Sequence, residues 1–305
     1  MAAYGRGVRV GNWLEDLHEQ EELLRDFISR RERGQLLMQR LARLQENILK
    51  KVKLSVSIDG LVHFGDTVMI MNPDTKTPEA KDDEKRGDLT LAVDMEEISL
   101  FSDDPPQVSR GLSAVNSVNP VGRNSFCIVS ADGSGVGEPL RFGQNFLLGT
   151  TGGISDTMFY LGSDHKTFTA FAKKSRLQPV FLTGEDSYLT CWQAAFLDPQ
   201  LRLEYEGFPV PANTKILITH CYTNRNLAIP RNFCVWSYFG KECEVVCHNY
   251  LDSHKVEEYK NYWEIITGNP GAEGGTMIDR PKPHPDGYKN FHEKTENIKI
   301  QDYIQ

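Results

Sequence analysis

The sequence predicts a mainly β protein whose core is a β-trefoil-like domain of three four-stranded repeats. Two observations predict it. Residues 208–268 alternate short apolar runs with turn-forming residues, as a compact all-β unit does. The same pattern occurs twice more, earlier in the chain. Because closing three such units buries one face of every hairpin and leaves few exposed edges, a closed twelve-stranded trefoil would accommodate them.

The spacing of aromatic residues supports the repeats. In the third repeat Trp263 lies 50 residues after Asn213, and in the second Trp192 lies 49 residues after Gly143. Equivalent positions predict equivalent roles, so both tryptophans are expected in the core, each at the base of its hairpins.

The first repeat is longer, with 61 residues between Gly65 and Phe126. A charged insertion at 75–87 covers the surplus and belongs in a solvated hairpin loop. The three repeats are therefore expected at about 61–130, 139–196 and 210–267. Their second strands are expected at 89–93, 158–161 and 227–229, and their third strands at 112–115, 179–182 and 244–247.

The third repeat is the most clearly punctuated by turn-forming residues. Its four strands are expected at 214–221, 226–229, 242–250 and 262–267.

Short motifs in these strands resemble a known repeat. The opening Phe-Gly-Asp-x-Val, the turn Asn-Arg-Asn-Leu, the strand Glu-x-Glu-Val-Val and the closing Trp-Glu-Ile are similar to the MIR repeat of protein mannosyltransferases and inositol-trisphosphate receptors. That resemblance implies a MIR-like β-trefoil.

Longer segments resemble a second family, and they span most of the chain. Residues 7–13, 191–213 and 250–257 are similar to the cilia- and flagella-associated protein 161 family. The resemblance implies a microtubule inner protein, fixed to the luminal wall of axonemal doublet microtubules and supporting motile cilium beating. It implies tubulin and neighbouring microtubule inner proteins as partners, and the cytoskeleton of the cilium or flagellum as the location.

The composition argues against proteins that bind nucleic acid or membranes through a broad basic surface. The chain has 305 residues, is 39% hydrophobic and carries a formal net charge of −8, so no broad basic surface for nucleic acid or anionic membrane is expected. No apolar run of about 18 residues and no signal peptide is evident, which predicts a cytoplasmic location. The six cysteines are then expected to be thiols rather than disulfides.

Residues 1–50 are expected to form a helical arm. Asn12 and Glu15 have the spacing of a capping box, and Gly34 divides two apolar stripes into two helices or loosens one. Five acidic residues lie in 15–22, whereas 30–51 holds seven basic and two acidic residues. This order complements the helix dipole. Either the arm packs on its own barrel or it docks on partners outside the core.

The core is expected at 51–267, and 268–305 is expected to be an extended or disordered tail, because its glycines and prolines cannot build regular structure. If arm and tail bind partners, basic and aromatic side chains are the candidate contacts. The candidate partner-binding residues are Trp13, Arg30, Arg31, Arg33, Arg40, Arg43, Tyr288, Phe291 and Tyr303.

Several patterns could carry chemistry, but each has a simpler interpretation. Gly133, Gly135 and Gly137 lack the helix and the lysine of a phosphate loop and favour a linker. Cys243, Cys247 and His248, with His254, carry metal-ligand atoms, yet the Cys-x3-Cys spacing on a strand favours a core face.

Ser163-Asp164-His165 favours a surface turn over a catalytic triad, because adjacent residues point apart. Glu204 and Glu206 favour solvated charge. No catalytic, cofactor or metal site is therefore expected, and the protein is expected not to be an enzyme.

Two other functions remain open at this point. A trefoil could bind carbohydrate or inositol phosphate, although the fold alone does not establish this and no aromatic and Asp/Asn pocket recurs in all three repeats. A thiol hydrolase would require a cysteine of low pKa.

Overall fold

The computed structural model describes residues 13–74, 87–94, 111–151, 158–237, 239–271 and 275–277. It divides the chain into two compact units, residues 1–50 and residues 51–305.

The first unit contains two helices, α1 (Trp13–Glu32) and α2 (Leu37–Leu49). Gly34 lies between them with φ of +68°, a left-handed conformation that ends a helix and that glycine adopts at little cost. The side chain of Gln39 ties the two together: its Oε1 accepts from the Leu36 amide at 3.3 Å and its Nε2 donates to the Arg31 carbonyl at 3.1 Å. Asn12, the expected cap of α1, lies outside the described residues.

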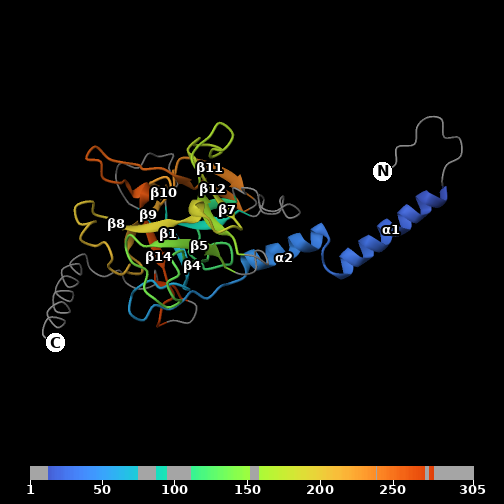
Figure 1. Ribbon diagram of the computed structural model, residues 1–305, viewed down its shortest axis with the longest axis horizontal. Helices are drawn as coiled ribbons and strands as arrows, with labels where there is room; N and C mark the ends of the chain where they lie inside the picture. The colour runs from blue at the N-terminus through green and yellow to red at the C-terminus, as the bar shows by residue number, and fades with distance from the viewer. Residues whose placement is uncertain are drawn as a thin grey trace. The chain divides into compact units, whose positions relative to one another are not determined.

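The second unit is built of short antiparallel strands (Figure 1). The strands of the first two repeats are β1 (Thr67–Asn72), β2 (Leu89–Val93), β3 (Leu112–Val115), β4 (Phe126–Ser130), β5 (Asn145–Thr150), β6 (Tyr160–Ser163), β7 (Gln178–Thr183) and β8 (Trp192–Phe196). Those of the third repeat are β9 (Lys215–His220), β10 (Arg225–Ala228), β11 (Cys234–Ser237), β12 (Gly240–Glu244), β13 (Val246–Cys247) and β14 (Trp263–Ile266). Two short 3-10 turns are η1 (Tyr188–Thr190) and η2 (Tyr259–Asn261).

Six strands pair in a closed ring. β1 pairs with β4, β4 with β5, β5 with β8, β8 with β9, β9 with β14, and β14 returns to β1. Six of the remaining eight strands form one pair per repeat, β2–β3, β6–β7 and β10–β13, and the first strand of each pair also pairs with the first strand of its repeat. The same connectivity therefore occurs three times.

The third repeat differs from the expected four strands. The predicted strand 242–250 is two strands, because the chain changes partners at Val245: β12 pairs with β3 and β13 pairs with β7. An additional strand, β11, pairs with β12 at Cys234–Cys243 through to Ser237–Gly240. The sheet therefore has fourteen strands rather than twelve, and the prediction of four strands in this repeat was wrong.

One end of the ring is closed by backbone hydrogen bonds that run in a cycle. The Val62 amide donates to the Val210 carbonyl, the Val210 amide to Leu140, and the Leu140 amide to Val62, at 3.0, 2.7 and 2.8 Å. All three side chains are fully buried. This cycle relates the three repeats directly, because each contributes one donor, one acceptor and one apolar side chain.

The residues that opened the sequence repeats share a conformation. Gly65, Gly143 and Asn213 have φ of +91°, +78° and +57°, and each amide donates to a carbonyl of the last strand of its own repeat. This turn requires the left-handed region, which glycine and asparagine tolerate best. The spacing found in the sequence therefore marks a real structural position.

The expected aromatic core residues are buried at equivalent places. Phe126, Trp192 and Trp263 are the first residues of β4, β8 and β14, and all three are fully buried. The Trp192 indole N–H donates to Leu161 of β6 at 2.8 Å, and that of Trp263 donates to Leu227 of β10 at 2.9 Å. The prediction that both tryptophans belong to the core is confirmed.

Candidate partner-binding site

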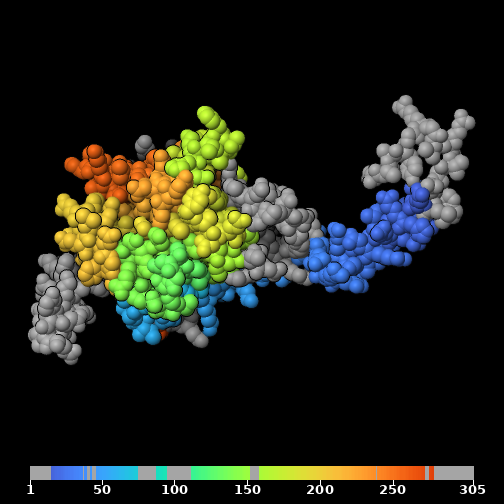
Figure 2. Space-filling model, viewed as in Figure 1, coloured from blue at the N-terminus to red at the C-terminus, as the bar shows by residue number. Residues whose placement is uncertain are grey.

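Helix α1 carries an exposed apolar surface. Leu17 and Leu24, which lie seven residues apart, are 44% and 57% exposed, and Leu23 and Phe27 are 63% and 47% exposed. In the space-filling view the side chains of α1 (blue) lie on the surface of the helix (Figure 2). Large apolar side chains gathered on one exposed helix are typical of a surface that binds another protein.

Three of the five predicted arginine contacts lie at the basic end of α1: Arg30 and Arg31 are in its last turn, and Arg33 follows its last residue. Arg30, Arg31 and Arg33 are exposed, and Arg30 is paired within the helix to Asp26 at 2.9 Å. An exposed pair of this kind contributes little stability, about 0.3–0.5 kcal/mol, so Arg30 can exchange it for an external carboxylate. Acidic Glu15 and Asp16 lie in the first turn, so the charges follow the helix dipole as expected.

The other predicted contacts are less fully described. Trp13 begins α1, and Arg40 and Arg43 lie in α2, but the structure describes only their backbone. Tyr288, Phe291 and Tyr303 lie outside the described residues.

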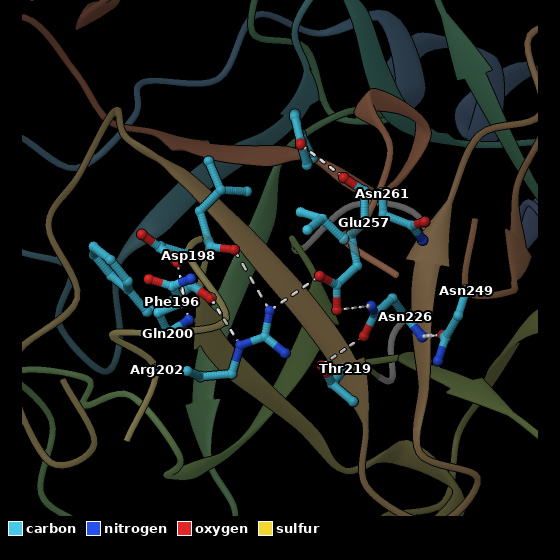
Figure 3. Close-up of polar contacts among 12 residues, drawn as sticks. Phe196, Asp198, Gln200, Arg202, Thr219, Asn226, Asn249, Glu257 and Asn261 are labelled. Carbon is cyan, nitrogen blue, oxygen red and sulfur yellow. Dashed lines mark hydrogen bonds and ion pairs between the residues drawn. The ribbon is translucent and has the colours of Figure 1, made fainter. Parts of the chain in front are cut away.

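The core contains an ion pair that the sequence interpretation missed (Figure 3). Arg202, in the loop after β8, donates from Nη2 to Glu257 Oε2 at 3.1 Å and from Nε to the Phe196 carbonyl at 3.0 Å. The two side chains are 34% and 10% exposed, so the carboxylate is the more buried partner. Arg202 therefore joins the 198–211 connection to the loop before η2.

Glu257 continues this network into the third repeat. Its Oε1 accepts from Asn226 Nδ2 at 3.5 Å, and Asn226 Oδ1 accepts from the Thr219 hydroxyl at 2.8 Å. The Asn226 amide donates to Asn249 Oδ1 at 2.7 Å, as Figure 3 shows. The polar groups of these loops are therefore satisfied within the core, and the network positions loops rather than reacting groups.

Aromatic rings also pack against the connection at 198–211. Phe196 and Tyr205 stack with ring centroids 3.9 Å apart and planes 3° apart, and Phe142 packs edge-on against Phe196 at 5.8 Å. The connection at 198–211 contains no strand of its own. It is instead held by one ion pair and one aromatic cluster.

The glycine-rich connection between β4 and β5 holds an anion of its own. The Asp132 carboxylate accepts from the hydroxyls of Ser130 and Ser134 at 2.8 and 2.7 Å, from the Ser134 amide at 3.1 Å and from Gln144 Nε2 at 2.9 Å. These donors, first the Gln144 amide group, hold the pKa of Asp132 well below its usual range. A phosphate would have to displace this carboxylate, so the loop does not form a phosphate site.

The Ser163-Asp164-His165 sequence forms no triad. The buried Ser163 hydroxyl donates to the Pro179 carbonyl at 2.8 Å and accepts from Gln178 at 2.9 Å. The exposed His165 ring instead lies 5.1 Å from the ring of Tyr222. The serine therefore has no histidine base beside it.

The cysteine and histidine side chains that could ligate a metal, Cys243, Cys247, His248 and His254, are not gathered as a metal site. Cys247 is fully buried, and burial raises the pKa of its thiol to about 12. Cys243 lies against Cys234, whereas His254 is exposed. Within the described ranges, no group of three or more His, Cys, Asp and Glu side chains is placed to hold a metal ion. All six cysteines are thiols.

A groove of about 410 Å³ lies where the chain enters and leaves the core. Val52, Leu54, Val56 and Pro120 line one part of it. Of the residues lining this groove, which all belong to the described part of the chain, Lys53 alone is charged. Inositol phosphates need several cationic donors and sugars favour an aromatic platform, so the groove suits neither well.

Comparison with known proteins identifies the family. A family model described as the cilia- and flagella-associated protein 161-like domain matches residues 40–268. The chain is 52% identical to "Cilia- and flagella-associated protein 161" of Bos taurus, covering 97% of this chain and 92% of the relative, and 42% identical to that of Danio rerio, covering 90% and 91%.

The chain belongs to the cilia- and flagella-associated protein 161 family.

The match to this family runs from Arg40, within α2, to Gly268, two residues after the end of β14. It therefore includes every strand of the ring. It also includes Arg202 and Glu257, which lie in the two long segments that carried the resemblance in the sequence. Among solved structures, an SDF2-like protein from Arabidopsis thaliana is 12% identical with a TM-score of 0.46, covering 67% of this chain and 94% of that one. In the part of the chain that the structure describes, no helix is both long and apolar enough to cross a membrane.

Proposed function

We propose that this protein is a non-enzymatic structural component of ciliary and flagellar doublet microtubules, a microtubule inner protein that binds the luminal wall and supports beating. Its family membership assigns it to cilia and flagella. The observation that carries the proposal beyond the family name is α1, a 20-residue helix with exposed leucines and a basic last turn.

In this proposal the core is a MIR-like β-trefoil that serves as a platform. The closed ring, the three equivalent hairpins and the cyclic hydrogen bonds of Val62, Leu140 and Val210 support the trefoil. The polar networks described above are satisfied internally, and they stabilise loops. The platform therefore offers a rigid shape, whereas the arm offers exposed apolar and basic side chains.

The proposed partners are tubulin and neighbouring inner proteins. The exposed arginines of α1 suit carboxylates, and its leucines suit an apolar groove. The net charge of −8 disfavours simple electrostatic attraction to a strongly acidic outer microtubule face, which supports the luminal wall as the proposed site. Several weak contacts made together would hold the protein, because docking one element raises the effective concentration of the others.

The direct test is a density map of native doublet microtubules at side-chain resolution. We expect density for the strand ring on the luminal wall, with α1 against tubulin or another inner protein. A ring found only on the outer wall, or α1 in contact with nothing but its own core, would contradict the proposal.

A biochemical test uses cells with motile cilia that lack their own copy. Full-length tagged protein should stay with axonemes through detergent and high salt, because luminal proteins are sheltered, and should leave only when the doublets are disrupted. A thermal-shift screen against glycans and inositol phosphates tests the ligand-binding alternative, since a ligand present at about 100 times its Kd raises the stability by about 2.7 kcal/mol.

A further inference from the structure

Two cysteines face each other across the β11–β12 hairpin. Cys234 of β11 is paired directly with Cys243 of β12, and their Sγ atoms lie 3.2 Å apart. Cys243 is fully buried, whereas Cys234 is half-buried. Cys234 is therefore the more exposed residue of the pair.

The hydrogen-bond pattern of the hairpin puts this pair at the closer of the two antiparallel spacings. The Glu244 amide donates to the Phe233 carbonyl at 2.9 Å, which makes Phe233–Glu244 a hydrogen-bonded pair. Pairs alternate along an antiparallel ladder, so Cys234–Cys243 is a non-hydrogen-bonded pair, whose Cα atoms lie about 4.5 Å apart. Disulfides span Cα distances of about 4.4–6.8 Å, so the backbone need not move.

A second pair of cysteines lies on neighbouring strands but does not have the geometry of the Cys234–Cys243 pair. Cys191 and Cys221 also face each other, at the end of β8–β9, but the Cys221 amide donates to the Cys191 carbonyl at 3.1 Å, so this is the wider pair. Their sulfurs point to other groups, Cys191 to the Ser187 carbonyl at 3.7 Å and Cys221 to Asn145 Oδ1 at 3.4 Å. Burial raises the pKa of Cys221 to about 12, which suppresses its thiolate.

We propose that Cys234 and Cys243 are a redox modification site, which a small disulfide such as oxidised glutathione converts into an intra-hairpin disulfide. The Cys234 thiolate attacks one glutathione sulfur and releases one reduced glutathione. Cys243 then attacks the Cys234 sulfur and releases the second. Two protein thiols are oxidised, one glutathione disulfide is reduced to two thiols, and the protein protons pass to the released thiolates or to solvent.

The disulfide would fasten β11 to β12. Trp236, on β11, is 80% exposed, and β12 joins the core through β3. In the oxidised protein a covalent bond would join β11 to β12 two residues before Trp236, which would restrict the movement of this tryptophan. This proposal rests on the hairpin alone and does not require the luminal location.

The test equilibrates the full-length protein with oxidised and reduced glutathione, quenches it in acid, and counts thiols after denaturation. We expect six thiols to fall to four, with the new bond mapped by peptide mass spectrometry to residues 234 and 243 and reversed by dithiothreitol. The variant Cys191→Ser with Cys221→Ser should also lose two thiols, from four to two. Amides of β11 should exchange with solvent more slowly in the oxidised protein.

The variant Cys243→Ser supplies the matched control, because Cys234 can then form only a mixed disulfide with glutathione. A mixed disulfide of the same stability in the wild-type protein would overturn the proposal. So would a disulfide mapped to residues 191 and 221, the absence of oxidation in buffers that oxidise other protein dithiols, or unchanged exchange of the β11 amides after oxidation.

Discussion

At the scale of single residues, the core depends on large side chains at matching positions of the repeats. Trp192 and Trp263 each fill the start of a ring strand and each hydrogen-bond a carbonyl of their own repeat's hairpin. Phe126 takes the same position without a polar group. The indole groups therefore add a directional contact to packing that a phenyl ring already provides.

Replacing Trp263 by alanine should lower the free energy of unfolding by about 3–5 kcal/mol, because it leaves a large buried cavity and removes a hydrogen bond. Trp236→Ala is the matched control: that side chain is 80% exposed, so its loss should change stability by no more than about 0.5 kcal/mol. Urea unfolding followed by circular dichroism measures both. Equal losses in the two variants would contradict the assigned core.

His220 should make stability depend on pH. Its ring is fully buried, with Nε2 2.9 Å from the Leu189 carbonyl and Nδ1 2.8 Å from the Thr223 hydroxyl. The carbonyl can only accept, so Nε2 carries the proton of a neutral ring. Burial lowers the pKa of His220, against the opposing influence of the Leu189 carbonyl and of Asp164, and burial also lowers the pKa of His248.

Because both histidines bind protons more weakly in the folded state, their contribution to stability is present above the unfolded pKa of about 6.5 and is lost as the pH falls. Between pH 7.5 and 5.5 the loss should be at most about 1.4 kcal/mol for each histidine. His220→Gln should make the fall in unfolding free energy shallower over this range. An unchanged slope in this variant would show that folding does not lower the pKa of His220.

At the scale of elements, loops are fastened by side chains from distant parts of the chain. Arg202 and Glu257 are 55 residues apart, and their ion pair joins two connections that have no strand of their own. Arg202 also donates to the backbone at Phe196, so one guanidinium makes two contacts at once.

Arg202→Ala should destabilise the protein by about 1–3 kcal/mol, because it leaves the largely buried Glu257 carboxylate without its cation. Arg202→Lys should recover part of this loss, since a lysine keeps the charge but cannot contact Phe196 and Glu257 together. The double variant Arg202→Met with Glu257→Gln should be more stable than Arg202→Ala. Additive effects in a double-mutant cycle would argue against the pair.

The sequence could predict what is repeated and local, but not what is long-range. Gly143 to Trp192 and Asn213 to Trp263 keep nearly the same spacing, because a left-handed turn and a buried corner recur in each unit. The Arg202–Glu257 pair leaves no such signal, since a single ion pair between two loops has no period.

The added hairpin was missed for a physical reason that can be named. Residues 242–250 were predicted to be one strand, yet the chain changes partners at Val245 and contributes to two hairpins. The preceding β11 is only four residues long and carries the exposed Trp236, so it lacks an alternation of apolar and polar residues. The buried Arg123–Glu242 ion pair, at 3.0 Å, explains why a charged residue lies inside β12.

At the scale of the whole molecule, the chain consists of two units that differ in how they bury their apolar side chains. The core closes its own ring of strands, whereas α1 exposes Leu17, Leu23 and Leu24. Such a division is typical of a stable platform joined to a segment that binds elsewhere.

Charge on the arm offers one test of this division. Arg31→Glu with Arg33→Glu should reduce the fraction of protein retained in salt-washed axonemes, because both arginines are exposed on the basic end of the arm. Arg31→Lys with Arg33→Lys keeps the charge and should retain most of the binding. The helix content of both variants, measured by circular dichroism, should match that of the wild type, so that a loss of retention reports contacts rather than unfolding.

Deleting residues 1–50 tests the division directly. The ring, its cyclic hydrogen bonds and both buried tryptophans lie entirely within 51–305, so the truncated protein should unfold in one cooperative transition within a few degrees of the full-length midpoint. Its retention in axonemes should nevertheless fall sharply, because the exposed leucines and arginines of α1 are gone. A truncated protein that is retained as fully as the intact chain would assign binding to the platform. One that no longer folds would show that the core needs the arm for its stability.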